Sequence, residues 1–161
     1  MKIIFFSSIG LYAKSMDVDE TKGFRDVNFG DDITKFEDMS LIDENAWGGK
    51  FYLRESDKKQ IGDIYLSRIE YWFFNGKVFM VVLKSNAENR TDLIELFVEK
   101  YGKYDRDRNL VSWTGKRIHV TCINGESSLT VYLSYRPINK KYEDASSKFQ
   151  SDKKEKALND L

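Results

Sequence analysis

The 161-residue sequence predicts a single α+β domain in which an antiparallel sheet carries helices on one face. Two observations predict this class. Short runs rich in β-branched and aromatic residues are separated by Gly and Asn-Gly turn motifs, and an amphipathic helical segment stands between two groups of such runs. The order helix, strand, strand, strand therefore occurs twice, and we expect a tandem α-β-β-β arrangement.

The first thirteen residues have the order of a short secretory signal. Lys2 precedes the apolar stretch 3–6, and Ala13 is a small residue of the kind found at a cleavage site. Leu11 is larger than the small residue preferred at the third position before the cut, and typical signals have about 15–30 residues. We interpret 1–13 as a signal peptide, with an edge strand, or a leader that begins upstream, as the alternatives.

The predicted domain, residues 14–138, opens with an acidic segment. Between Asp17 and Glu44 there are ten acidic and three basic residues, so this segment carries −7 and the rest of the chain +7. Such a segment either keeps the start of the domain soluble, which we favour, or marks a partner surface. Within it, Gly30-Asp31-Asp32 offers a capping carboxylate for a short amphipathic helix over 31–39, whose apolar positions recur every three residues.

Three strands are predicted after this helix, over 51–55, 64–74 and 77–83. Asn75-Gly76 stands between the last two runs. This dipeptide predicts a tight hairpin, because both central residues of a type I′ turn need positive φ.

The second half begins with the strongest helical segment, 90–102. Asn89 is placed to cap this helix and Gly102 to end it. Its apolar face carries Leu93, Leu96, Phe97 and Tyr101. Strands are then predicted over 110–113, 117–123 and 129–136. Asn124-Gly125 stands before the last strand, at the position equivalent to the Asn-Gly of the first half.

The C-terminal segment, 139–161, follows Pro137, which ends the sheet. It is rich in Lys, Glu, Asp and Ser, and only a few apolar residues recur at helical spacing, among them Tyr142 and Phe149. We therefore expect a solvated charged helix or a frayed tail.

Two capped helical motifs carry a family resemblance. They are Phe29-Gly30-Asp31-Asp32-Ile33 and Phe97-Val98-Glu99-Lys100-Tyr101-Gly102, each followed by three predicted strands. This order resembles the β-lactamase-inhibitor-protein-like group, which includes the small outer-membrane assembly lipoproteins. The resemblance covers about residues 24–136 and implies an exported binding or scaffold domain. Because no Cys follows the leader, this chain departs from the lipoprotein members and the resemblance does not extend to a lipid anchor.

The chain lacks the residue sets of common catalytic and metal sites. One Cys (Cys122) and one His (His119) exclude an intrachain disulfide and multi-ligand zinc sites, and strand alternation puts these two side chains on opposite faces. Asp17-Val18-Asp19-Glu20 begins like a calcium loop, but the required Gly and Glu are misplaced. We predict no cofactor, no metal and no enzymatic activity. The acidic pairs Asp31-Asp32 and Glu37-Asp38 support, as a third hypothesis, an enzyme that uses loop carboxylates.

Sheet parity places an unusual group of side chains on the face away from the helices. Phe79, Val81 and Leu83 are expected to point into the core. The opposite face then combines aromatic, cationic and acidic residues, a composition found at protein interfaces. The candidate protein-binding residues are Arg68, Glu70, Trp72, Lys84, His119 and Tyr132. The alternatives are that the C-terminal segment covers this face, or that its charged pairs hold an ordinary solvated sheet.

These observations favour a non-catalytic, exported protein-binding or cell-envelope scaffold module of a bacterium, located in the periplasm or envelope. The alternative is a cytoplasmic immunity- or inhibitor-type accessory protein. Zero net charge disfavours a nucleic-acid partner, and no apolar run is long enough for a membrane span. We therefore expect a protein partner.

Overall fold

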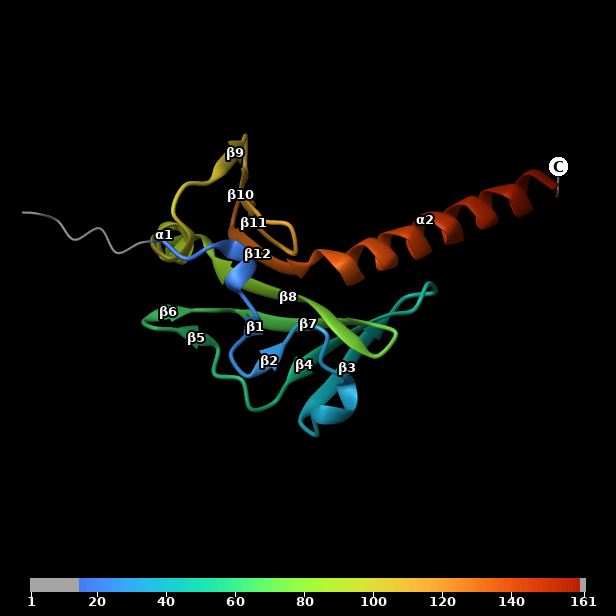
Figure 1. Cartoon of the computed structure of the whole chain (residues 1–161), viewed down its shortest axis with the longest axis horizontal. Coiled ribbons are helices and arrows are strands. Elements are labelled where there is room, and N and C mark those ends of the chain that lie inside the picture. Colours follow the sequence, from blue (N-terminus) through green and yellow to red (C-terminus); the bar gives the residue numbers. More distant parts are fainter. Residues whose placement is uncertain (1–14, 160–161) are drawn as a thin grey trace, which may run out of the picture.

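The computed structural model describes residues 15–159, so the predicted signal peptide over 1–13 lies outside the described residues. Within that part of the chain, eight strands form one antiparallel sheet in the order β3-β4-β7-β8-β12-β11-β10-β9 (Figure 1). The predicted α+β class with an antiparallel sheet is confirmed. The strands of this main sheet are β3 (Met39–Glu44), β4 (Gly49–Arg54), β7 (Arg68–Phe74), β8 (Lys77–Asn86), β9 (Asp105–Asp107), β10 (Leu110–Thr114), β11 (Ile118–Asn124) and β12 (Ser128–Tyr135).

The main sheet consists of two meanders joined at its centre. β4, β7 and β8 form the first, β10, β11 and β12 form the second, and β8 pairs with β12 between them. Asn75 and Gly76 have φ angles of 50° and 74° and form the predicted tight hairpin between β7 and β8. In the second half, Asn124 is the last residue of β11 and pairs with Leu129, and residues 125–127 connect it to β12, so this hairpin lacks the positive φ angles of the first. Both halves therefore contain the predicted three successive strands, but the tandem α-β-β-β arrangement is wrong, because a 3-10 turn stands where the first helix was expected, and the C-terminal helix lies on the face of the sheet opposite the other helix.

The hydrophobic core lies between one face of the main sheet and a layer formed by α1 (Arg90–Tyr101) and the segments 15–38 and 55–67. The helix α1 matches the helix predicted over 90–102 and buries Leu93, Phe97 and Tyr101. Alternate residues of five strands point to the same core, because side chains alternate between the faces of a sheet. These buried residues are Ile69, Tyr71, Phe73, Val81, Leu83, Val111, Trp113, Ile118, Val120, Cys122, Leu129, Val131 and Leu133.

The short helix predicted over 31–39 is wrong. The structure has a single 3-10 turn there, η2 (Ile33–Lys35), before β3 begins. The cause is the pairing of this segment with the start of β8: the Gly30 amide donates to the Val78 carbonyl (2.8 Å), and the Val78 amide donates to the Asp31 carbonyl (3.0 Å). Backbone groups held by a neighbouring strand cannot continue a helix.

The C-terminal helix α2 (Arg136–Asn159) lies against the face of the main sheet opposite α1, at one end of that face. Its Tyr142 ring packs on Phe74 and Phe79, with ring centroids 5.8 Å and 4.9 Å apart. Beyond Phe149 every described residue of α2 is exposed, and the helix extends away from the sheet (Figure 1). The charged C-terminal segment is therefore a helix that is attached only by its first turns.

Phe79 was expected in the core, but it contacts α2. The register between β7 and β8 shifts at this point, where Trp72 pairs with Met80 but Phe73 pairs with Val78. Phe79 is the extra residue of this β-bulge, and the bulge turns its side chain to the α2 face.

The remaining short elements complete the described fold. They are η1 (Val18–Glu20), β1 (Gly23–Phe24), β2 (Val27–Asn28), β5 (Gln60–Ile61), β6 (Ile64–Tyr65) and η3 (Ala87–Asn89). β1 and β2 form one small hairpin and β5 and β6 another. β6 and β7 divide the run that was predicted as one strand, and the unpredicted strands β3 and β9 extend the main sheet at its two edges.

Candidate functional site

The six candidate residues lie on one face of the main sheet, the face opposite α1, which we call the outer face. Strand pairing arranges this face in rows that run across β7, β8, β12 and β11. Three neighbouring rows hold the candidates: Trp72–Met80–Ser134–His119, Glu70–Val82–Tyr132–Thr121 and Arg68–Lys84–Thr130–Ile123. The strand alternation used in the prediction thus brings the six residues to a shared surface.

An aromatic cluster occupies the middle of the outer face. The Trp72 ring meets Phe51 of β4 edge-on, with centroids 4.7 Å apart, and it meets Tyr132 in the same way at 6.3 Å. Such edge-to-face pairs fix the orientation of the rings. Phe51 was missed by sequence reasoning, because only the pairing of β4 with β7 shows that Phe51 stands beside Trp72.

Glu70 contacts two cations and one indole through its side chain. Its carboxylate contacts Arg68 Nε (2.8 Å) and Lys84 Nζ (2.9 Å), and the indole Nε1 of Trp72 donates to it at 3.0 Å. Burial alone would raise the pKa of Glu70, but the hydrogen bonds from Trp72 and Lys84 and the charges of both cations outweigh it and lower this pKa. Glu70 is therefore an ionised anchor that holds the charged side chains in place.

The outer face stays open beyond its α2-covered end. The ring contacts of α2 lie near the β7–β8 hairpin, where Tyr142 approaches so closely that a Cβ on Gly49 would come within 2.6 Å of its ring. Farther along the strands, the side chains of Arg68 and Lys84 are 43% and 40% exposed, while that of Glu70 is 8% exposed. The uncovered surface thus presents cations and aromatic edges.

His119 lies at the far end of the row that begins with Trp72, diagonally beside Tyr132 of the neighbouring strand β12. It stands three strands from Trp72, about 14 Å at the usual strand spacing. Its Nδ1 shares a hydrogen bond of 2.9 Å with the Thr114 hydroxyl, and it is half-buried beside the first turn of α2. Burial and the nearby charge of Arg136 lower the pKa of His119. Cys122, three residues along the same strand, is buried in the core, where burial raises the pKa of its thiol to about 12.

Three of the four acidic residues considered for catalysis, Asp31, Asp32 and Asp38, make structural contacts. Asp32 caps η2 by accepting from the Thr34 amide (3.0 Å), and this bond together with Lys77 lowers the pKa of Asp32 to about 2. Asp31 pairs with Lys35 at 2.5 Å. These acids act as a helix cap and as an ion-pair partner.

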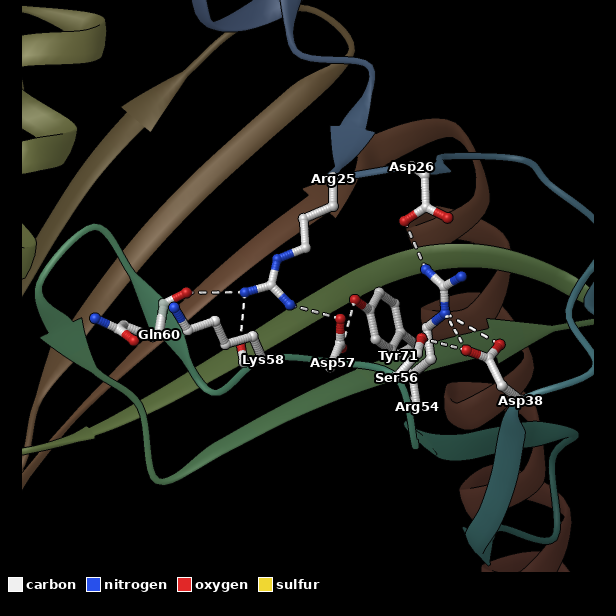
Figure 2. A network of polar contacts seen from close by, with 9 residues as sticks. All are labelled: Arg25, Asp26, Asp38, Arg54, Ser56, Asp57, Lys58, Gln60 and Tyr71. Carbon is white, nitrogen blue, oxygen red and sulfur yellow. Dashed lines mark hydrogen bonds and ion pairs between the residues drawn. The ribbon is translucent and has the colours of Figure 1, made fainter.

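A polar network fastens the N-terminal segment to the loop that follows β4 (Figure 2). Arg54 binds Asp26 (2.6 Å) and Asp38 (2.9 Å), and Asp38 also accepts from the Ser56 hydroxyl. In the second part of the network, Asp57 accepts from Arg25 (2.6 Å) and from the Tyr71 hydroxyl (2.8 Å). The network lies on the core side of the sheet and is distinct from the outer face.

Two further findings concern residues 15–159 only. No group of three or more His, Cys, Asp or Glu side chains in this range is arranged to hold a metal ion. None of its helices combines the length and the apolar character needed to cross a membrane.

Comparison of the chain with protein-family models, curated proteins and solved structures found no match.

Proposed function

We propose that this chain is a non-catalytic, exported bacterial module that binds a protein partner with an acidic surface on its outer face. One observation carries the proposal: α2 leaves uncovered an aromatic cluster of Phe51, Trp72 and Tyr132 beside two exposed cations. Aromatic and Arg side chains contribute most of the binding energy at protein interfaces.

The charge of the uncovered surface supports an acidic partner. Arg68 and Lys84 are far more exposed than the Glu70 carboxylate that lies between them. An approaching protein therefore meets two cations and little of the anion. Complementary charge increases the association rate and orients the partner.

The two leading hypotheses use this face in the same way and differ in location. An envelope module meets its partner after export, whereas an inhibitor or immunity-type protein meets it in the cytoplasm. The fate of residues 1–13 separates these two, and we expect them to be removed on export. The resemblance to exported binding domains favours the envelope module.

The proposal can be tested by site-specific photo-crosslinking in the source organism. A photoreactive phenylalanine analogue at Tyr132 should yield one discrete adduct with a second protein. The matched control is the same analogue at Tyr65 of β6, which is 68% exposed but lies outside the main sheet. The adduct formed by the analogue at position 132 should disappear when Arg68 and Lys84 are both changed to Glu.

Affinity measurements with the crosslinked protein then test the cluster itself. Trp72→Ala and Tyr132→Ala should each weaken binding by roughly thirtyfold, the loss typical of an interface anchor. The free energy of unfolding should change far less, because both side chains lie on the outer face and neither belongs to the hydrophobic core. Equal crosslinking from Tyr65 and Tyr132, no adduct from Tyr132, or unfolding of both alanine variants would each contradict the proposal.

A further inference from the structure

A groove lies at the start of α2, directly after β12 and beside the connection between β10 and β11. Its volume is about 590 Å³, and the residues used below are Thr114, Lys116, His119, Ser134, Arg136 and Lys140. Two hydrogen bonds fix the position of Arg136. Its backbone amide donates to the Arg117 carbonyl (2.8 Å), and its side-chain Nη1 donates to the Gly115 carbonyl (2.7 Å). The groove is thus bounded by the sheet on one side and by a helix on the other.

The groove carries an excess of positive charge. Lys116, Arg136 and Lys140 line it together with a single carboxylate, Glu143. Within residues 15–159, neither Lys116 nor Arg136 has an ion-pair partner. Lys140 pairs with Asp144 at 3.3 Å, but both side chains are largely exposed, so water and salt weaken this pair. The carboxylate of Glu143 accepts a hydrogen bond from Asn139 of the same helix.

The floor of the groove adds neutral hydrogen-bonding groups. The Ser134 hydroxyl is buried there and donates to the His119 carbonyl at 3.1 Å. Because the Thr114 hydroxyl engages Nδ1 of His119, Nε2 is the ring nitrogen left for a ligand. Two lysines, a guanidinium and an imidazole therefore surround one hollow that is about as large as sites for small organic molecules.

We propose that this groove binds the phosphate group of a small phosphorylated molecule. Guanidinium and ammonium groups are the donors that proteins use for phosphate, and Lys116, Arg136 and Lys140 all line this groove. The site is separate from the aromatic cluster, so it does not depend on a protein partner. It gives the only imidazole of the chain a ligand-contacting position.

His119 makes the proposal directly measurable. As it is the only His among the 161 residues, its ring gives a single Cε1–H proton resonance. Its neighbours in the groove are Thr114 and Ser134 from the sheet, Lys116 from the loop, and Arg136, Lys140 and Glu143 from α2. A bound phosphate brings negative charge among these cations and favours the imidazolium form. The pKa of His119 should therefore rise, by about one pH unit for an anion in contact.

The experiment titrates the full chain with inorganic phosphate, glycerol phosphate and citrate at constant ionic strength. Both phosphates should shift the His119 resonance to saturation, and glycerol phosphate should bind at least as tightly as inorganic phosphate. Lys116→Gln and Lys140→Gln should each weaken binding by about tenfold. The matched control, Lys148→Gln, changes an exposed lysine of the same helix outside the groove and should leave the affinity unchanged.

Other outcomes overturn the proposal. A shift that follows ionic strength alone, or an affinity that Lys116→Gln and Lys140→Gln leave intact, means that the groove is not a phosphate site. Binding of citrate as tight as that of the phosphates would contradict the assignment to phosphate. Trp72→Ala separates the two proposals: it should weaken binding of the protein partner by roughly thirtyfold and leave phosphate binding unchanged.

Discussion

Asp19 ties the N-terminal segment to a loop that lies 97 to 99 residues farther along the chain. Its carboxylate accepts from three consecutive backbone amides, those of Lys116 (2.6 Å), Arg117 (2.7 Å) and Ile118 (2.8 Å). The fit depends on Gly115, because a Cβ there would lie 2.3 Å from the carboxylate. One side chain thus satisfies three donors of the β10–β11 connection at once.

Replacing this carboxylate by an amide should lower stability in a pH-dependent way. Burial alone would raise the pKa of Asp19, but the three backbone bonds and Arg117 outweigh it and lower this pKa. A lowered carboxyl pKa stabilises the fold above the unfolded value, about 3.9, and this contribution is lost as the pH falls through the folded value. At pH 7 we expect Asp19→Asn to reduce the free energy of unfolding by about 1–2 kcal/mol.

Urea denaturation at pH 7 and at pH 3 measures this difference. The difference in the free energy of unfolding between wild type and Asp19→Asn should narrow at pH 3, because the stabilisation is lost as the pH falls below the unfolded pKa of about 3.9 towards the lower folded value. Glu20→Gln, which changes the exposed neighbour, is the matched control and should have little effect. A gap of the same size at both pH values would refute the ionic origin of the contact.

Single residues also mark the limit of prediction from sequence. Strand alternation correctly separated Cys122 from His119, since that separation is a local property of one strand. The place of Phe79 depended on a β-bulge, which shifts the register by one residue and leaves no pattern in the sequence. The role of Asp19 was not predicted, because a contact between distant segments cannot be derived from local spacing.

The helix α2 combines an attached half and a free half. In the attached half, the Tyr142 hydroxyl accepts a hydrogen bond from Asn45 (2.9 Å), and the Tyr142 ring packs on Phe79.

Deleting residues 150–161 should change the melting temperature by less than about 2 °C, because the described part of this segment is wholly exposed. Tyr142→Ala should lower it by roughly 4–8 °C, as expected for a loss of about 2 kcal/mol. Thermal unfolding followed by circular dichroism compares the two, and an equal drop would show that the free half also stabilises the fold.

Elements with strong local patterns were predicted, and those that depend on tertiary pairing were not. The hairpin at Asn75-Gly76 and the helix α1 follow from turn chemistry and from apolar periodicity. β3 escaped prediction because its residues are acidic or exposed and it exists only through its pairing with β4. The predicted helix over 31–39 failed for the related reason that β8 holds its backbone.

At the scale of the whole molecule, removal of the first thirteen residues should leave the fold intact. The first described backbone bond joins the Met16 amide to the Lys100 carbonyl at the end of α1 (2.8 Å), so a cut after Ala13 would spare it. Mass spectrometry of the chain after cell fractionation should find Lys14 as the first residue of a periplasmic form. Recovery of intact Met1 from the cytosol, with no shortened form elsewhere, would instead support the cytoplasmic inhibitor hypothesis.

The central pairing of β8 with β12 also has a consequence for how quickly the chain reaches its native state. The pairs β7–β8, β10–β11 and β11–β12 join strands that follow each other directly in sequence, so these hairpins close short loops within microseconds, and only the β4–β7 connection contains further strands. The seam between Asn86 of β8 and Ser128 of β12 must bring together residues separated by all of α1, β9, β10 and β11. The chain loses conformational entropy when that long loop closes, before the contacts between β8 and β12 contribute any favourable free energy. The two halves should therefore form first, and the pairing of β8 with β12 should limit the rate of folding.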